Sequence, residues 1–178
     1  MIVDSSKNPV RATALAMVPS IDLRLIHLVR DGRGVAWSGR KAFQKDEQSG
    51  IMANIKPRPI WRTAIEWSAV NLLSGWGRHQ VDSGKSVLIR YEDLMSNPVG
   101  TLNKVGRVMG CDLSGVASAV SRGEAMEIGH TIAGNRLRTQ GPVRMRHDTE
   151  WINRLSAKDR RIFWTLAGWL MRRYEYTR

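Results

Sequence analysis

The chain has 178 residues, of which 42% are hydrophobic and 25% are charged, a balance that excludes a largely disordered protein and is typical of one globular domain. Lys and Arg number 28 against 16 Asp and Glu, so the net charge is +12, and 21 of the basic residues are Arg. This charge predicts an anionic partner, such as nucleic acid, a nucleotide, an acidic glycan or a membrane surface, although an Arg bias also arises from genome composition.

The lone cysteine, Cys111, excludes a disulfide framework and a cysteine-based zinc site. The four histidines show no metal-ligand spacing, so we expect no metal. No apolar run approaches the length of a membrane span, and residues 1–4 lack the basic and apolar blocks of a signal peptide. We therefore expect a cytoplasmic protein without a membrane span.

The first third of the chain predicts strand, helix, strand and helix in that order. Residues 2–3 resemble the start of a strand, and 9–17 predict a short helix with Pro9 in its first turn. Residues 23–29 are apolar and branched, as in a buried strand. Asp31 follows as a helix cap, with helix expected over 35–43.

The rest of the chain predicts one further strand among helices, with polar or basic connections. We expect a loop at 44–56, a turn at 82–85, a strand at 86–91 and a basic functional loop at 129–147. Helices are expected over 57–81, 97–109 (Pro98 at its start, Gly110 at its end), 115–121, 149–155 and 157–174. The expected buried stripes are Trp61, Ile65, Val70, Leu72, Leu73 and Trp76 in the long helix, and Ile162, Leu166, Trp169 and Leu170 in the last.

This strand–helix alternation predicts an α/β fold with a parallel sheet flanked by helices. Only three strands are visible, which is few for a sheet covered on both faces. The chain therefore resembles the second part of a larger α/β domain.

Two glycine-bearing segments do not qualify as phosphate loops. Residues 83–86 read Ser-Gly-Lys-Ser, but position 79 is His79 rather than Gly, and the segment precedes a strand instead of opening a helix. Residues 32–34 lack the third Gly of a dinucleotide fingerprint, because Trp37 stands in its place.

The segment 27–38 is a stronger candidate for anion binding. A strand ends at Arg30, a glycine-bearing turn follows, and a helix begins, so Arg30 lies where α/β sheets bind ligands. Ser38, two turns into that helix, can add a hydroxyl donor. The alternative is that Arg30 pairs with a nearby acid and Ser38 is ordinary helix surface.

The same segment resembles the strand–loop–helix of sulfotransferases that use 3′-phosphoadenosine-5′-phosphosulfate (PAPS), which holds the 3′-phosphate of that donor. The resemblance assigns this role to Arg30 and Ser38, and it implies a P-loop-like sulfotransferase fold. Residues 87–98 resemble the YEDL…P segment that follows the next strand, which implies that Tyr91 approaches the adenine. The alternative for Tyr91 is a core aromatic residue at a strand end.

Residues 130–138 resemble the GNPxR-type segment of bacterial members, with Arg136 where Pro is usual. The resemblance implies that Asn135 and Arg138 close a basic loop over the donor. Those members continue with a basic loop and a Trp-bearing helix pair, as Arg144, Arg146, Asp148 and Trp151 do here.

Lys7 stands where many members carry their catalytic His. A Lys there can neutralise charge on the bridging oxygen as the sulfuryl group leaves, or act as a base if it is desolvated. It can equally be a structural salt-bridge partner.

Family members begin with a strand and a turn that grips the 5′-phosphosulfate, and nothing like it appears before residue 7. We therefore expect residues 1–178 to form one sulfotransferase-like domain that is N-terminally truncated and lacks that strand and loop. The missing strand predicts association through an exposed sheet edge.

The resemblance implies transfer of a sulfuryl group from PAPS to an acceptor hydroxyl or amine that the sequence does not identify. Two alternatives stay open. One is a catalytically inactive remnant that binds a nucleotide such as adenosine 3′,5′-bisphosphate (PAP). The other is a basic nucleic-acid-binding module, which requires aromatic residues interleaved with Arg on an exposed face. The expected helix stripes place most of the seven Trp in the core instead.

Overall fold

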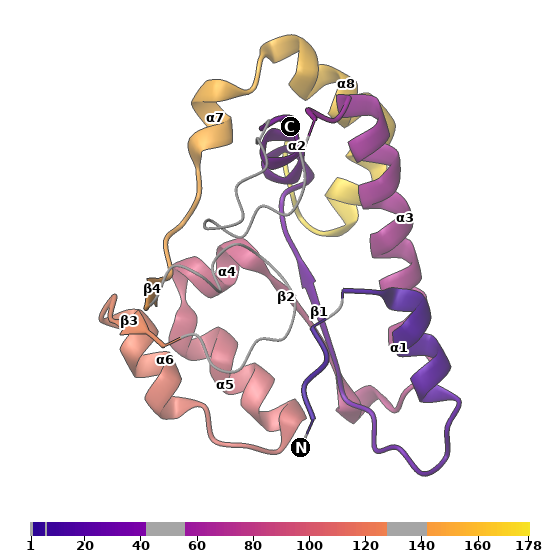
Figure 1. The fold of residues 1–178 in the computed structure, drawn as a ribbon, viewed down its shortest axis with the longest axis vertical. Helices are drawn as coiled ribbons and strands as arrows, with labels where there is room; N and C mark the ends of the chain where they lie inside the picture. Colours follow the sequence, from indigo (N-terminus) through magenta and orange to yellow (C-terminus); the bar gives the residue numbers. More distant parts are fainter. Residues whose placement is uncertain (1, 6, 42–55, 128–141) are drawn as a thin grey trace.

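The computed structural model describes residues 2–5, 7–41, 56–127 and 142–178 (Figure 1). Most of the described elements are helices, and short strands lie between groups of them. The helices are α1 (Pro9–Ala16), α2 (Gly32–Arg40), α3 (Ile60–Arg78), the 3₁₀ turn η1 (Ser83–Lys85), α4 (Tyr91–Ser96), α5 (Pro98–Met109), α6 (Ser114–Ser121), α7 (Glu150–Arg154) and α8 (Ala157–Arg173). The strands are β1 (Leu25–Val29), β2 (Ser86–Arg90), β3 (Ala125–Met126) and β4 (Val143–Arg144).

The centre of the fold is a parallel pair, β1 with β2, in which Leu25 lies opposite Ser86 and Val29 opposite Arg90. Helices α3 and α8 pack on one face of this pair, where Val29, Trp67 and Phe163 share the main core. Helix α5 packs on the other face through Val105. The predicted α/β fold, a small parallel sheet flanked by helices, is confirmed (Figure 1).

Local sequence signals determine several element ends. The Asn8 side chain caps α1 by accepting from the amides of Val10 and Arg11, and Pro9 follows in the first turn. The Asp31 carboxylate accepts from the Arg33 amide at the start of α2, which begins three residues earlier than predicted. Helix α5 ends at Gly110 with φ of 68°, as its sequence predicts.

The predicted buried stripe of α3 is wrong. All six of its members are exposed, including Trp61 at 55% and Trp76 at 54%. The helix instead buries a face of smaller and polar residues around one indole: Ile60, Thr63, Ala64, Trp67, Asn71 and Gly77. Apolar residues surround this helix on several sides, so hydrophobicity alone did not identify the face that meets α1, α2, α8 and β1.

The last helix shows the same error in part. Leu170 is buried as predicted, but Leu166 and Trp169 are 40% and 52% exposed, while Phe163 and Ala167 are fully buried. At the start of the chain, residues 2–3 are not a strand. The structure adds two elements that sequence patterns missed, namely helix α4 and the two-residue antiparallel pair of β3 with β4. Both are too short to leave a period in the sequence.

Strand β1 leaves apolar side chains uncovered on the face where α5 packs. Val87 and Ile89 of β2 are buried there, but their register neighbours Ile26 and Leu28 are 46% and 51% exposed. Helix α5 therefore covers this face of β2 but leaves the same face of β1 exposed. None of the described helices is long and apolar enough to cross a membrane.

Candidate functional site

The carboxyl ends of the two parallel strands bring Arg30 and Tyr91 together. Val29, the last residue of β1, lies opposite Arg90, the last residue of β2, so the residues that follow the strands are neighbours. The Arg30 guanidinium lies over the Tyr91 ring, 4.8 Å from its centroid. This pair is the nucleus of the candidate site, and both residues are ones to which the family resemblance assigns a role.

The Arg30 guanidinium pairs with an acid from a distant part of the chain. Its Nη2 donates to Oδ2 of Asp148 at 2.9 Å and lies 3.4 Å from the Asp148 carbonyl oxygen. The two side chains are 25% and 38% exposed, so the pair lies at the edge of solvent. Burial alone would raise the pKa of Asp148, but hydrogen bonds from Arg30 and the Glu150 amide hold that pKa below its ordinary value.

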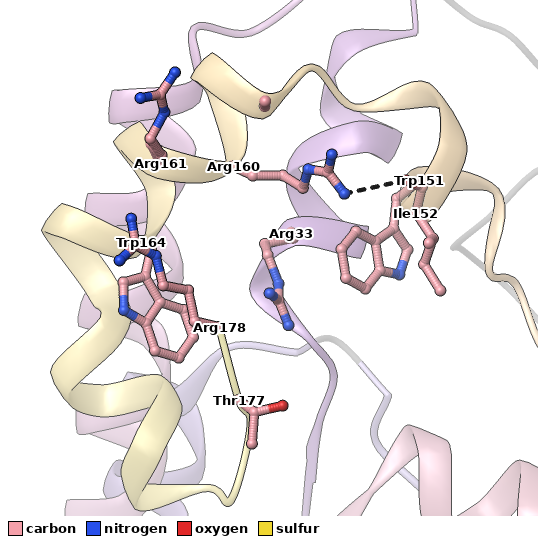
Figure 2. A pocket seen from close by; sticks show the side chains of 9 residues that line it. Arg33, Trp151, Ile152, Arg160, Arg161, Trp164, Thr177 and Arg178 are labelled. Carbon is pink, nitrogen blue, oxygen red and sulfur yellow. Dashed lines mark hydrogen bonds between the residues drawn. The ribbon is translucent and has the colours of Figure 1, made fainter.

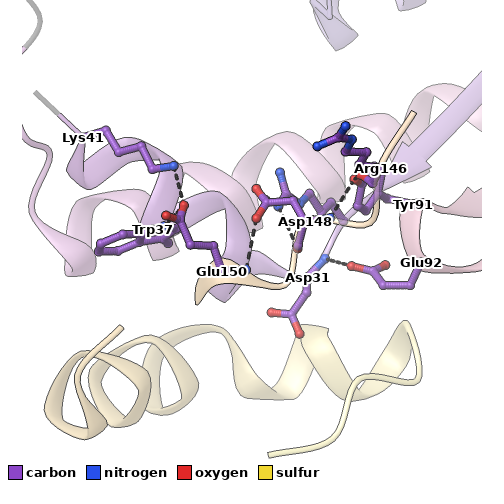
Figure 3. A network of polar contacts seen from close by, with 9 residues as sticks. Asp31, Trp37, Lys41, Tyr91, Glu92, Arg146, Asp148 and Glu150 are labelled. Atoms are coloured by element: carbon purple, nitrogen blue, oxygen red, sulfur yellow. Dashed lines mark hydrogen bonds and ion pairs between the residues drawn. The ribbon is translucent and has the colours of Figure 1, made fainter. Parts of the chain in front are cut away.

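The Tyr91 hydroxyl holds the backbone of the segment that carries Asp148 (Figure 3). It donates to the Arg146 carbonyl at 2.7 Å and accepts from the Asp148 amide at 3.2 Å. The Tyr91 ring also meets the edge of His147 at 6.0 Å between centroids. Tyr91 is therefore not a core aromatic residue. It lies at the edge of solvent and binds residues 146–148 through its hydroxyl.

A second carboxylate, Glu150, anchors the start of α7 to α2. Glu150 Oε2 accepts from the Lys41 ammonium at 2.6 Å and from the Trp37 indole at 2.9 Å (Figure 3). These hydrogen bonds lower the pKa of Glu150, chiefly through Lys41. Asp148 and Glu150, two residues apart, thus pair with different basic side chains: Asp148 with Arg30, and Glu150 with Lys41.

The turn that carries Arg30 is fixed by partly buried hydrogen bonds. The Arg30 carbonyl accepts from the Trp67 indole at 3.1 Å, and the Asp31 amide donates to Glu92 Oε1 at 3.0 Å. The Tyr176 hydroxyl donates to the other Glu92 oxygen at 2.6 Å. Groups from α3, α4 and the C-terminal segment therefore hold the backbone that positions the Arg30 side chain.

Gly34 lets Arg30 and α7 approach α2 closely. A Cβ at position 34 would lie 3.1 Å from Cδ1 of Trp151 and 3.2 Å from Nε of Arg30. Both distances are shorter than ordinary carbon contacts, so a side chain here would push Arg30 or Trp151 aside. The glycines of residues 32–34 thus serve packing, in agreement with their rejection as a dinucleotide loop.

The other predicted site residues are less closely joined. Ser38 is exposed on α2, two turns after Arg30. Lys7 is exposed before α1, in the left-handed region with φ of 59°, and among the described residues no contact joins it to Arg30 or Tyr91. Asn135 and Arg138 lie outside the described residues.

A cleft of about 420 Å³ lies on the other side of Trp151, lined by side chains of α2, α7, α8 and the C-terminal segment (Figure 2). Its centre is Arg33, whose guanidinium lies 4.6 Å from the Trp151 ring and 5.5 Å from the Trp164 ring. Arg33 also pairs with the buried Asp31 at 2.7 Å. Arg33 is neutralised by Asp31 and lies against indoles of α7 and α8, so it joins these helices to α2.

Sequence reasoning found Arg30 and Tyr91 but missed the residues that hold them. Asp148 was noted only as part of a basic segment, Glu92 only as part of the YEDL motif without a role of its own, and Tyr176 lies in no motif. Their partners lie 61 to 118 residues away in sequence, so no local spacing signals the contacts. Among the described residues, no group of three or more His, Cys, Asp and Glu side chains is arranged to hold a metal ion.

Chemically, the site presents one guanidinium at a sheet edge, next to an aromatic ring and just before a helix that begins at Gly32. This arrangement can bind a phosphate or sulfate group once Arg30 is freed from its carboxylate.

Neither the curated proteins nor the solved structures compared with this chain include a match. A family model does match, and its description is "Sulfotransferase family". The match covers residues 12–115, more than half of the chain, and includes β1, Arg30, α2, β2 and Tyr91. This chain therefore belongs to the sulfotransferase family.

Proposed function

We propose that this chain binds the 3′-phosphate of PAPS through Arg30 and takes part in transfer of its sulfuryl group. The observation that carries the proposal is the position of Arg30, which is partly exposed at the carboxyl end of β1 and adjoins the Tyr91 ring. A guanidinium presents paired N–H donors that match phosphate oxygens. The family match supports a sulfotransferase in general, and the arginine supports this donor in particular.

The proposed reaction is an in-line displacement at sulfur. The acceptor oxygen or nitrogen forms a bond to sulfur while the bond from sulfur to the bridging phosphate oxygen breaks. That oxygen keeps the electron pair and leaves as part of PAP, and the acceptor's proton passes to solvent. By analogy with phosphoryl transfer, the transition state is loose, so positioning and charge stabilisation provide the catalysis.

The remaining residue roles follow the family resemblance. Ser38 adds a hydroxyl to the 3′-phosphate, Tyr91 supports the adenine, and Asn135 and Arg138 close over the donor. Lys7 neutralises charge on the leaving oxygen.

The test is binding of PAP to the purified chain, followed by thermal unfolding. At 100 times its dissociation constant PAP adds about 2.7 kcal/mol, a rise in melting temperature of about 5 to 10 °C for a chain of this size. We expect Arg30→Ala to abolish this rise. Arg62→Ala is the matched control, because Arg62 is an exposed arginine on α3 whose ion pair is with Glu66.

A folded wild-type chain that shows no rise would refute the proposal, and so would an equal rise in Arg30→Ala. Binding of PAP without turnover of PAPS in the presence of acceptors would instead favour a nucleotide-binding protein without transferase activity.

The nucleic-acid alternative gains one observation from the structure. Trp61 and Trp76 are exposed on α3, contrary to the core position expected for them, and Arg62 lies beside Trp61 on the same helix. Exposed aromatic residues next to arginine can stack on bases. Binding of a single-stranded oligonucleotide that weakens steeply with salt and is lost in Trp61→Ala would support this alternative.

A further inference from the structure

We infer that Asp148 sets the affinity of the site for its anionic ligand, because it occupies the Arg30 guanidinium where the 3′-phosphate would bind. This inference rests on the proposed function of Arg30. It assigns to Asp148 the role of an internal competitor, which weakens the binding of nucleotides with a 3′-phosphate and leaves the binding of those without one unchanged.

The geometry of the pair supports competition for the same donors. Arg30 Nη2 directs its hydrogen bond at Oδ2 of Asp148 at 2.9 Å, and the Tyr91 ring lies against the guanidinium at 4.8 Å. The ring restricts the directions from which an anion reaches Arg30. A phosphate that engages the same N–H groups must therefore displace the carboxylate or share the guanidinium with it.

The contacts of Asp148 show that this displacement is feasible. Its side chain is 38% exposed, and its other carboxylate oxygen accepts a backbone hydrogen bond from the Glu150 amide at 3.1 Å. The backbone is held separately, through the Tyr91 hydroxyl. The side chain can therefore rotate away from Arg30 while residues 146–148 remain in place.

The charges favour replacement by a phosphate. A phosphate monoester carries about 1.5 to 2 negative charges at neutral pH, against one for a carboxylate. The ion pair still has a consequence for binding, since the observed affinity is reduced by the fraction of molecules in which Arg30 is already occupied. If the Asp148 carboxylate stays beside the bound phosphate, repulsion between the two negative charges reduces the affinity further.

Glu150 provides a matched comparison. It lies two residues from Asp148 and carries the same charge, but it pairs with Lys41 and Trp37 rather than with Arg30. A general electrostatic effect on an anionic ligand would appear in variants of either carboxylate. Direct competition for Arg30 would appear only in variants of Asp148.

The experiment is calorimetric titration of wild type, Asp148→Asn and Glu150→Gln with two probes, PAP and adenosine 5′-phosphate, which lacks the 3′-phosphate. We expect Asp148→Asn to bind PAP about twofold to fivefold more tightly than wild type, because one partly exposed ion pair contributes up to about 1 kcal/mol. We expect its affinity for adenosine 5′-phosphate to be unchanged, and Glu150→Gln to change the PAP affinity by less than about twofold.

Three results would overturn the inference: an unchanged PAP affinity in Asp148→Asn, an equal gain for both nucleotides, or an equal gain in Glu150→Gln. Should Asp148→Asn fail to fold, Asp148→Ser tests the same point with a side chain too short to reach Arg30. Arg30→Ala separates this failure from that of the proposed function. If PAP binding depends on Arg30 but not on Asp148, only the competitor role of Asp148 is excluded. If PAP binds neither wild type nor any variant, the proposed function of Arg30 is excluded as well.

Discussion

At the scale of single residues, His27 shows how a polar group is accommodated in the main core. Its Nε2 lies 2.9 Å from the Asn71 side-chain oxygen. Asn71 uses its amide nitrogen to donate to the Trp67 carbonyl at 2.8 Å, so its oxygen is the acceptor and His27 Nε2 donates. Nδ1 of His27 is buried without a hydrogen-bond partner among the described residues, which is compatible only with a neutral ring.

Burial lowers the pKa of His27, and the nearby charge of Arg78 adds to this effect. His27 therefore binds a proton less readily in the folded chain than in the unfolded chain, where a histidine has a pKa of about 6.5. Above the unfolded pKa, the neutral His27 ring makes its full contribution to the free energy of unfolding. This contribution is lost as the pH falls below the unfolded pKa, until the ring of the folded chain is also protonated.

We predict that the free energy of unfolding falls less between pH 7.5 and pH 5 in His27→Gln than in wild type, measured by urea denaturation. The amide of Gln can still donate to Asn71 but does not titrate. His147→Gln, a change at an exposed histidine, is the comparison. Parallel pH profiles for His27→Gln and wild type would contradict the assignment.

At the scale of elements, the position of Arg30 depends on the close packing of α2 against α8. A Cβ at Gly32 would lie 2.2 Å from Cζ of Phe163 and 3.2 Å from the Trp67 ring, and Phe163 is fully buried. Glycine is required here by close approach rather than by backbone conformation. The same close packing brings the turn that holds Arg30 down onto the main core.

We predict that Gly32→Ala destabilises the chain by about 1 to 3 kcal/mol, because the added methyl group overpacks the core against Phe163. Gly39→Ala is the matched control in the same helix. Its nearest neighbour would be the Thr63 hydroxyl at 3.7 Å, an ordinary contact, and alanine favours helix by up to about 1 kcal/mol. Chemical denaturation of both variants checks the prediction, which fails if Gly32→Ala is as stable as Gly39→Ala.

At the scale of the whole molecule, apolar surface remains uncovered in the described part of the chain. Ile26 and Leu28 are about half exposed on β1, and β1 pairs with a strand on one side only among the described residues. A strand with a free edge and exposed apolar side chains pairs readily with another chain.

We predict that the purified chain associates with itself in a concentration-dependent manner, measured by sedimentation equilibrium. The double variant Ile26→Thr/Leu28→Thr should weaken the association, because threonine preserves strand propensity while reducing the apolar surface. Ile65→Gln/Leu72→Gln on the exposed side of α3 is the comparison. A chain that stays monomeric at all concentrations, or an effect confined to the α3 variant, would exclude association through β1.

The sequence by itself determined the elements whose signals are local. The apolar and branched runs around residues 25–29 and 86–90 specified two strands, although Ile26 and Leu28 of the first are half exposed rather than buried. Pro9, Asp31 and Gly110 specified helix ends, since these signals involve only the nearest backbone groups. The two strand ends place Arg30 and Tyr91 at one edge of the sheet, but their contact was seen only in the structure.

Only the tertiary structure decided which face of α3 is buried and which acid meets Arg30. Apolar residues lie on several sides of α3, so burial depends on where α8 and β1 pack and not on the period of the sequence. Asp148 is 118 residues from Arg30, and many other acids in the chain have the same chemistry. The choice among them follows from the packing of α7 against α2 and from the Tyr91 hydroxyl, contacts that exist only once the chain has folded.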